Sequence, residues 1–254
     1  PNTAKPTNEV RAVRDPSTAQ AQPIRQTRPN EQLLLGRYRV MSSCGTGGFG
    51  TVLTCWDTRL QRRVAIKRMP LAIRGVYSGG AATMSEALAE ARTSSMLAHP
   101  NIVTMFDFEN DHDYAYLVME YVDGMTLTEL LSRVEGGTLT ADECAYMVRS
   151  LCDALAFAHE NGVLHLDIKP SNIMFDRSGA VKLCDFGMAT LASATGYGDA
   201  RGGTIGYMPP EQIEGGLVDE RSDVFALAVV AWYALTGDNP FAAGTAEESL
   251  AKIE

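Results

Sequence analysis

The sequence has no apolar stretch long enough to cross a bilayer. Its longest strongly apolar run, residues 224–235, has 12 residues, whereas a membrane-spanning helix needs about 20. The N-terminal segment also lacks the apolar centre of a secretory signal. We therefore expect no membrane segment in this chain and a cytoplasmic location, which would also suit the cytosolic part of a longer, membrane-anchored protein.

Paired cysteines and excess positive charge are missing as well. The five cysteines are odd in number and none is spaced as C-x-x-C, which argues against a disulfide framework or a zinc site and for a reducing compartment. The formal net charge is −9. This charge argues against binding to nucleic acid through bulk positive charge, so we expect no nucleic-acid partner.

Aromatic residues are absent from the first 35 residues, which hold five of the eleven prolines. No helical or strand period runs through this segment, so we predict a disordered arm or linker over 1–35. A solvated tail and a regulatory tail with phosphorylatable Thr and Ser both fit this composition. In the whole chain, hydrophobic residues make up 45% and charged residues 21%, which is enough to build a globular core.

Strand patterns dominate the region that follows the arm. Runs of β-branched and aromatic residues bounded by turn residues predict five strands, the first three forming a small antiparallel meander. A helix is predicted at 84–97, because Thr83 and Glu86 have the spacing of a capping box. The predicted strands are residues 38–41, 51–56, 63–69, 102–108 and 114–120.

Helical patterns dominate the second half. Thr140 and Glu143 form another capping box ahead of apolar residues at helical spacing, and Gly162 should end that helix. Residues 220–236 are apolar on all sides, which predicts a buried helix that stops at Gly237. Strands followed mainly by helices indicate an α+β protein with a small sheet lobe and a larger helical lobe.

A glycine-rich loop separates the first two predicted strands. A dinucleotide fingerprint would place a helix after the glycines and an acidic residue about 20 residues on, but here a strand follows, then Lys67. Lys67 shares a strand face with Ala65, and a buried lysine needs partners such as a phosphate and a carboxylate. A plain hairpin and a surface lysine remain the alternatives. The G-x-G-x-x-G-x-V pattern consists of Gly45, Thr46, Gly47, Gly48, Phe49, Gly50, Thr51 and Val52.

Residues suited to phosphoryl transfer gather further along the chain. Asp167, Lys169 and Asn172 lie within six residues, and Asp185 follows Asn172 by 13 residues. Asn and Asp oxygens are ligands for Mg²⁺. A nearby Asp orients a hydroxyl, and a Lys neutralises a moving phosphoryl group.

With these motifs in this order, the sequence resembles the protein kinase superfamily, in the eukaryotic-like (Hanks-type) Ser/Thr form found in bacteria. The resemblance covers residues 38–254. It implies a bilobal fold, with an N-lobe over 36–121 made of a small antiparallel sheet and one helix, and a mainly helical C-lobe over 122–254. The motifs are the glycine loop, Val-Ala-Ile-Lys ending at Lys67, the catalytic loop from His165, Asp-Phe-Gly from Asp185, and Pro-Pro-Glu ending at Glu211.

The resemblance implies roles for the charged residues. Lys67 would hold the α- and β-phosphates of ATP and pair with a glutamate of the first helix, for which Glu90 is our choice and Glu86 the alternative. Asp167 would orient the acceptor hydroxyl or accept its proton, and Lys169 would contact the γ-phosphate. The metal, Mg²⁺ or alternatively Mn²⁺, would be held by Asn172 and Asp185.

An adenine pocket is implied in the same way. Met119 matches the gatekeeper position, and the backbones of Glu120 and Val122 would bond the adenine ring. The ring would lie between three apolar residues, whose alternative reading is a plain core. These residues are Val52, Ala65 and Met174.

The implied function is transfer of the γ-phosphoryl group of Mg-ATP to a Ser or Thr of a protein substrate, which includes the chain itself. A pseudokinase acting as a nucleotide-binding scaffold is the main alternative, and a small-molecule phosphotransferase is another. A homodimer formed through the N-lobe stays open.

The sequence departs from the family pattern near its end. Glu211 normally pairs with an Arg far downstream, and no such Arg follows in the sequence, which ends at Glu254. The last helices of the family are missing after the helical pattern at 245–254. We therefore expect either a fragment of a longer protein or an abridged C-lobe. In contrast, Asp223 resembles the family's aspartate that holds the backbone of the catalytic loop.

A second departure yields a prediction. Leu166 stands where the family usually has an Arg that pairs with a phosphorylated residue of the activation segment, and leucine cannot form that pair. We predict that phosphorylation within 185–211 does not control activity through this pair. Kinase activity should be equal before and after phosphatase treatment, and a large loss after treatment would contradict this.

Overall fold

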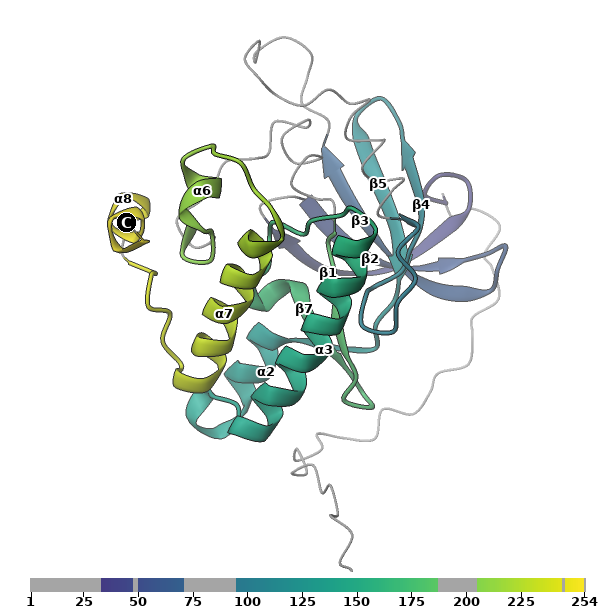
Figure 1. Cartoon of the computed structure of the whole chain (residues 1–254). Coiled ribbons are helices and arrows are strands. Elements are labelled where there is room, and N and C mark those ends of the chain that lie inside the picture. Colours follow the sequence, from purple (N-terminus) through teal and green to yellow (C-terminus); the bar gives the residue numbers. More distant parts are fainter. Residues whose placement is uncertain (1–32, 48–49, 71–94, 187–204, 244, 254) are drawn as a thin grey trace, which may run out of the picture. The chain divides into compact units, whose positions relative to one another are not determined.

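Two regions of different secondary structure follow each other along the chain (Figure 1). The computed structural model describes residues 33–47, 50–70, 95–186, 205–243 and 245–253. Nearly all of the predicted arm at 1–35 and of the predicted helix at 84–97 lies outside these residues. Within them, a five-stranded sheet comes first and a mostly helical region second, which confirms the expected α+β class.

The five-stranded sheet is antiparallel throughout, with strand order β1-β2-β3-β5-β4. Each predicted strand is present, but β4 begins three residues later than predicted, because Ile102 instead pairs with Leu183 outside this sheet. The first hairpin is also longer than predicted, since its strands pair as far as Gly47 and Gly50. The strands are β1 (Tyr38–Gly47), β2 (Gly50–Asp57), β3 (Arg62–Pro70), β4 (Met105–Asn110) and β5 (Tyr114–Glu120).

The helical region also contains a small antiparallel sheet of order β6-β7-β8. The strands of the small sheet are β6 (Gly124–Thr126), β7 (Ile173–Asp176) and β8 (Val181–Leu183).

None of the helices in the described part of the chain has the length and apolar character needed to span a membrane. The helices are α2 (Leu127–Arg133), α3 (Ala141–Glu160), α6 (Pro210–Ile213), α7 (Glu220–Thr236) and α8 (Ala246–Ile253), with 3₁₀ turns at Glu135–Gly137 and Pro170–Asn172.

Helix α3 begins and ends where its sequence predicts. The Thr140 side chain accepts from the Glu143 amide, and the Glu143 carboxylate accepts from the Thr140 amide at 2.8 Å, which completes the capping box. Gly162 has a φ of +72°, a conformation that stops a helix readily because glycine has no Cβ. The buried side of α3 then packs against α7 (Figure 1).

Helix α7 is buried on one side only, so the prediction of burial all round is wrong. Val224, Trp232 and Leu235 are 58%, 54% and 45% exposed. The opposite side is buried, and it contacts α3 through the apolar cluster that forms the core of the helical region. An all-round apolar composition could not reveal this difference, because it carries no information on which sides have neighbours.

The core beneath α3 predicts a strong response to truncation. Leu151 is fully buried, whereas Leu217 is 97% exposed. We expect Leu151→Ala to lower the free energy of unfolding by about 3 kcal/mol, because the lost contacts leave a cavity. The same change at Leu217 should alter it by less than about 0.5 kcal/mol. Urea denaturation of both variants checks this, and equal midpoints would contradict the placement of α3.

Candidate functional site

A buried ion pair joins the large sheet to the segment after β8. The Nζ of Lys67, on β3, lies 2.7 Å from Oδ2 of Asp185, and the two side chains are 7% and 16% exposed. Lys67 is therefore not a surface lysine. Its expected partner Glu90, and the alternative Glu86, lie outside the described residues.

The pair favours the charged forms of both groups. Burial acts to lower the pKa of Lys67, but the charge and hydrogen bond of Asp185 outweigh it, and the pKa is raised. Burial likewise acts to raise the pKa of Asp185, and the charge and hydrogen bond of Lys67 hold it below its ordinary value. Each partner thus keeps the other ionised at neutral pH.

The register of the sheet places the predicted adenine residues on the same face as Lys67. Directly paired residues of antiparallel strands share a face; Val52 pairs with Lys67, and Ala65 pairs with Met119. Ala65 and Lys67 are two residues apart on β3, so all four side chains lie on one face. The buried cluster around Ile66 occupies the other face, which leaves Val52, Ala65 and Met119 only partly buried.

At the end of β5, Glu120, one of the residues predicted to bond the adenine ring, contacts the small sheet. The amide of Glu120 donates to the Thr104 carbonyl at 2.9 Å, and its carboxylate lies 2.9 Å from Nζ of Lys182 on β8. Met174 pairs with Lys182 across β7 and β8, so both lie on the face that reaches Glu120. Val122 is buried.

The described part of the glycine loop is the hairpin of β1 and β2. Gly45 pairs with Val52, Thr46 with Thr51 and Gly47 with Gly50, whereas Gly48 and Phe49 lie outside the described residues. Gly50 has a φ of +124°, and a Cβ there would lie 2.2 Å from the Arg68 carbonyl oxygen. A side chain at this position would therefore collide with β3.

The residues of the predicted catalytic loop form a compact polar cluster. Lys169 Nζ lies 2.7 Å from Oδ2 of Asp167, and the side-chain amide of Asn172 donates to the same carboxylate at 3.0 Å. Asn172 also donates to the Asp167 carbonyl at 2.8 Å. The 3₁₀ turn Pro170–Asn172 brings Asn172 back toward Asp167.

Asn172 and Asp185 lie on adjoining segments. The amide of Cys184 donates to the Asn172 carbonyl at 2.9 Å, so Asp185 follows directly after this contact. Among the described residues, no three His, Cys, Asp or Glu side chains gather to hold a metal. One carboxylate and one amide oxygen suit Mg²⁺, which commonly takes its remaining ligands from water and substrate phosphates.

A fully buried carboxylate holds the backbone that leads to Asp167. Asp223 accepts from the amides of His165 and Leu166 at 2.8 and 2.7 Å, and its Oδ2 lies 2.9 Å from Nε2 of His159. This confirms the prediction that Asp223 holds the loop backbone.

Positioning contacts of two residues, His165 and Gln212, were not predicted. His165 is fully buried, its Nε2 donates to the Cys184 carbonyl at 2.9 Å, and its Nδ1 accepts from the Asp167 amide at 3.2 Å. The side-chain amide of Gln212 donates to the Leu166 carbonyl at 2.8 Å. Gln212 follows the Pro-Glu motif directly, but nothing in the sequence indicates its contact 46 residues away.

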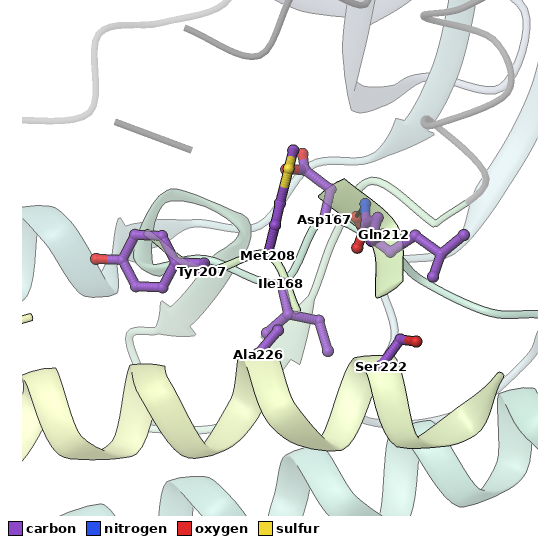
Figure 2. A pocket seen from close by; sticks show the side chains of 8 residues that line it. Asp167, Ile168, Tyr207, Met208, Gln212, Ser222 and Ala226 are labelled. Carbon is purple, nitrogen blue, oxygen red and sulfur yellow. Dashed lines mark hydrogen bonds between the residues drawn. The ribbon is translucent and has the colours of Figure 1, made fainter. Parts of the chain in front are cut away.

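A small pocket adjoins Asp167 on the side of residues 205–213. Figure 2 shows the Met208 and Asp167 side chains pointing away from α7, which carries the lining residues Ser222 and Ala226. Gln212 also lines it. The Asp167 side chain is 10% exposed.

Comparison with known proteins agrees with this arrangement. The protein kinase domain family matches residues 38–254. The chain is 39% identical over 208 residues to the serine/threonine-protein kinase PrkC of Bacillus subtilis, covering 81% of this chain and 31% of that protein. It is 36% identical over 216 residues to PknB of Mycobacterium tuberculosis strain H37Rv, covering 82% and 34%.

A third relative is PknL of Mycobacterium tuberculosis, which is 37% identical over 222 residues and is covered for 54% of its length. The chain thus spans between about a third and about half of the length of these relatives. The resemblance inferred from the motifs is confirmed.

The role of Asp223 can be tested through stability. In Asp223→Asn, an NH₂ group replaces one carboxylate oxygen and faces backbone donors, so we expect a loss of about 3 kcal/mol in the free energy of unfolding. Asp238, which is exposed just beyond α7, supplies the matched control. Asp238→Asn should change stability by less than about 0.5 kcal/mol. Equal urea midpoints for the two variants would show that the loop does not depend on Asp223.

Proposed function

We propose, because this chain belongs to the protein kinase domain family, that it transfers the γ-phosphoryl group of ATP to a Ser or Thr hydroxyl of a protein substrate, the chain itself included. The main support for the proposal is that two groups of charged and polar residues lie next to each other. The Lys67–Asp185 pair comes from the sheet and the segment after β8, and the Asp167–Lys169–Asn172 cluster lies beside it through the contact of Cys184 with Asn172. The names of the relatives support Ser and Thr as acceptors.

ATP would lie along the face of the sheet that carries Lys67. The ammonium group of Lys67 would hold the α- and β-phosphates, and Glu90 would be its second carboxylate partner. The backbone of the glycine loop would cover the phosphates. The adenine ring would lie against the partly buried side chains on this face, with backbone bonds from Glu120 and Val122. These side chains are Val52, Ala65, Met119 and, from the small sheet, Met174.

Asn172 and Asp185 would hold the divalent cation, Mg²⁺ or alternatively Mn²⁺. The cation would neutralise the charge on the phosphate oxygens. The side-chain oxygens of Asn172 and Asp185 are suitable ligands for a hard cation. Because Lys67 keeps Asp185 ionised, the carboxylate is ready to bind the cation at neutral pH.

Asp167 and Lys169 would act on the reacting atoms. The acceptor oxygen forms a bond to the γ-phosphorus as the bond from that phosphorus to the β-phosphate oxygen breaks, and the acceptor proton passes to the Asp167 carboxylate. Lys169, 2.7 Å from Asp167, would neutralise charge on the transferred group.

We further propose a cytoplasmic location for this domain. All five cysteines are free, and Cys44 and Cys152 are exposed. Exposed free thiols suit a reducing compartment, where ATP is also available. Homodimerisation through the N-lobe stays a prediction.

Intact mass after incubation with Mg-ATP tests the activity. We expect the unaltered chain to gain phosphoryl groups, and Asp167→Asn to gain them at least about 100-fold more slowly, because it has lost the proton acceptor. The matched control is Asp153→Asn, on the exposed side of α3. It should behave like the unaltered chain.

Two outcomes would count against the proposal. Equal phosphorylation of the unaltered chain and Asp167→Asn would remove Asp167 from the mechanism. Nucleotide binding by the unaltered chain without phosphoryl transfer to itself or to a general protein substrate would favour the scaffold alternative.

A further inference from the structure

The residue before Asp167 has an unusual backbone conformation. Leu166 has a φ of +60°, a left-handed region that costs a side-chain-bearing residue about 1–2 kcal/mol. Such a conformation persists where the surroundings hold it. Here both backbone groups of Leu166 are held: its amide donates to Asp223 at 2.7 Å and its carbonyl accepts from Gln212 at 2.8 Å. Because Asp167 follows directly, these bonds also orient its carboxylate.

Gln212 is itself held in place by α7. Its neighbour Glu211 accepts a hydrogen bond from the Ser222 hydroxyl at 2.7 Å, and Ser222 precedes Asp223. The contacts therefore form a closed ring from Leu166 to Asp223 and Ser222, across to Glu211 and Gln212, and back to Leu166. Gln212 and Ser222 line the pocket beside Asp167, as Figure 2 shows.

The Leu166 side chain carries no charge, and the ring holds its backbone through an uncharged donor, the carboxamide of Gln212. A leucine side chain cannot pair with a phosphate, so a phosphorylated segment cannot hold this residue through its side chain. The carboxamide of Gln212 reaches the backbone instead and needs no modification to do so.

We propose that Gln212 is a positioning residue for the phosphoryl transfer described above. It holds the carbonyl of Leu166, and through it Asp167, in the reactive arrangement without phosphate on residues 185–211. This inference rests on the proposed kinase function, and its test separates the two.

The first test compares kinetics in three variants. Gln212→Met keeps the length of the side chain and removes the donor, and we expect kcat to fall about tenfold with an unchanged KM for ATP. The fall should be equal before and after phosphatase treatment. Gln212→Lys restores a donor and should recover most of the lost kcat. Glu214→Met, at the exposed C-cap of α6, should leave both constants unchanged.

Three results would overturn the proposal: an unaltered kcat in Gln212→Met, a rise in KM for ATP that accounts for the whole loss, or a Gln212→Lys variant as slow as Gln212→Met. A merely structural role would not split kcat from KM in this way.

Hydrogen exchange supplies a readout that needs no catalysis. In Gln212→Met, amide exchange of the peptide covering 163–169 should be faster by about tenfold, because Leu166 can leave its hydrogen-bonded conformation. If the unaltered chain transfers no phosphoryl group, the kinase proposal fails, and this measurement still decides whether Gln212 holds the loop. Unchanged exchange would overturn the positioning role.

Discussion

The buried pair of Lys67 and Asp185 is the constraint on which the site depends. A lysine on the inner face of a sheet has a large desolvation cost unless an opposite charge meets it. The partner comes from 118 residues further along the chain, so the sheet and the segment after β8 must meet at this point. Buried ion pairs contribute little net stability. The Lys67–Asp185 pair instead fixes the geometry of the site, because it brings the sheet face that carries Val52 and Ala65 to the segment that carries Asp185.

The second constraint is the fixed position of the catalytic loop on α7. Asp223 is fully buried and accepts two consecutive backbone amides, which makes the loop follow the helix. His165 then ties the same loop to Cys184, and so to the segment that carries Asp185. The polar cluster around Asp167 is thus connected to both the ion pair and the helical core by short hydrogen bonds.

Local signals explain why much of this arrangement could be predicted from the sequence. The start of α3 is encoded by Thr140 and Glu143, its end by Gly162, and β3 by the alternating β-branched residues Val64 and Ile66; each signal depends on neighbours within a few residues. Helix α2 was not predicted, although Thr126 and Glu129 form a complete capping box in the structure. That signal was present and local, and it could have been found.

The contacts that could not be predicted join residues far apart in the sequence. The bond from Gln212 to Leu166 depends on how α6 lies against α7, and the pairing of Glu120 with Lys182 depends on how the small sheet meets β5. The exposed side of α7 belongs to the same class, since Trp232 and the buried Val230 are both apolar and differ only in their neighbours. The order of the motifs does predict which residues form the site, because phosphoryl transfer requires particular residue types. It does not predict the hydrogen bonds that hold these residues in place.

The way the loop is held has a consequence for control of the activity. A phosphate can act as a switch where its charge creates a partner that was absent before. Around Leu166, the described partners are a carboxylate of α7 and a neutral carboxamide of α6, and both are present in every state of modification. Control at this point would therefore have to break contacts rather than make them. The Lys67–Asp185 pair is likewise a contact between distant segments, and it joins the sheet to the segment after β8. A change that separates the sheet from the segment after β8 would break this pair and leave two buried charges uncompensated, which is strongly unfavourable.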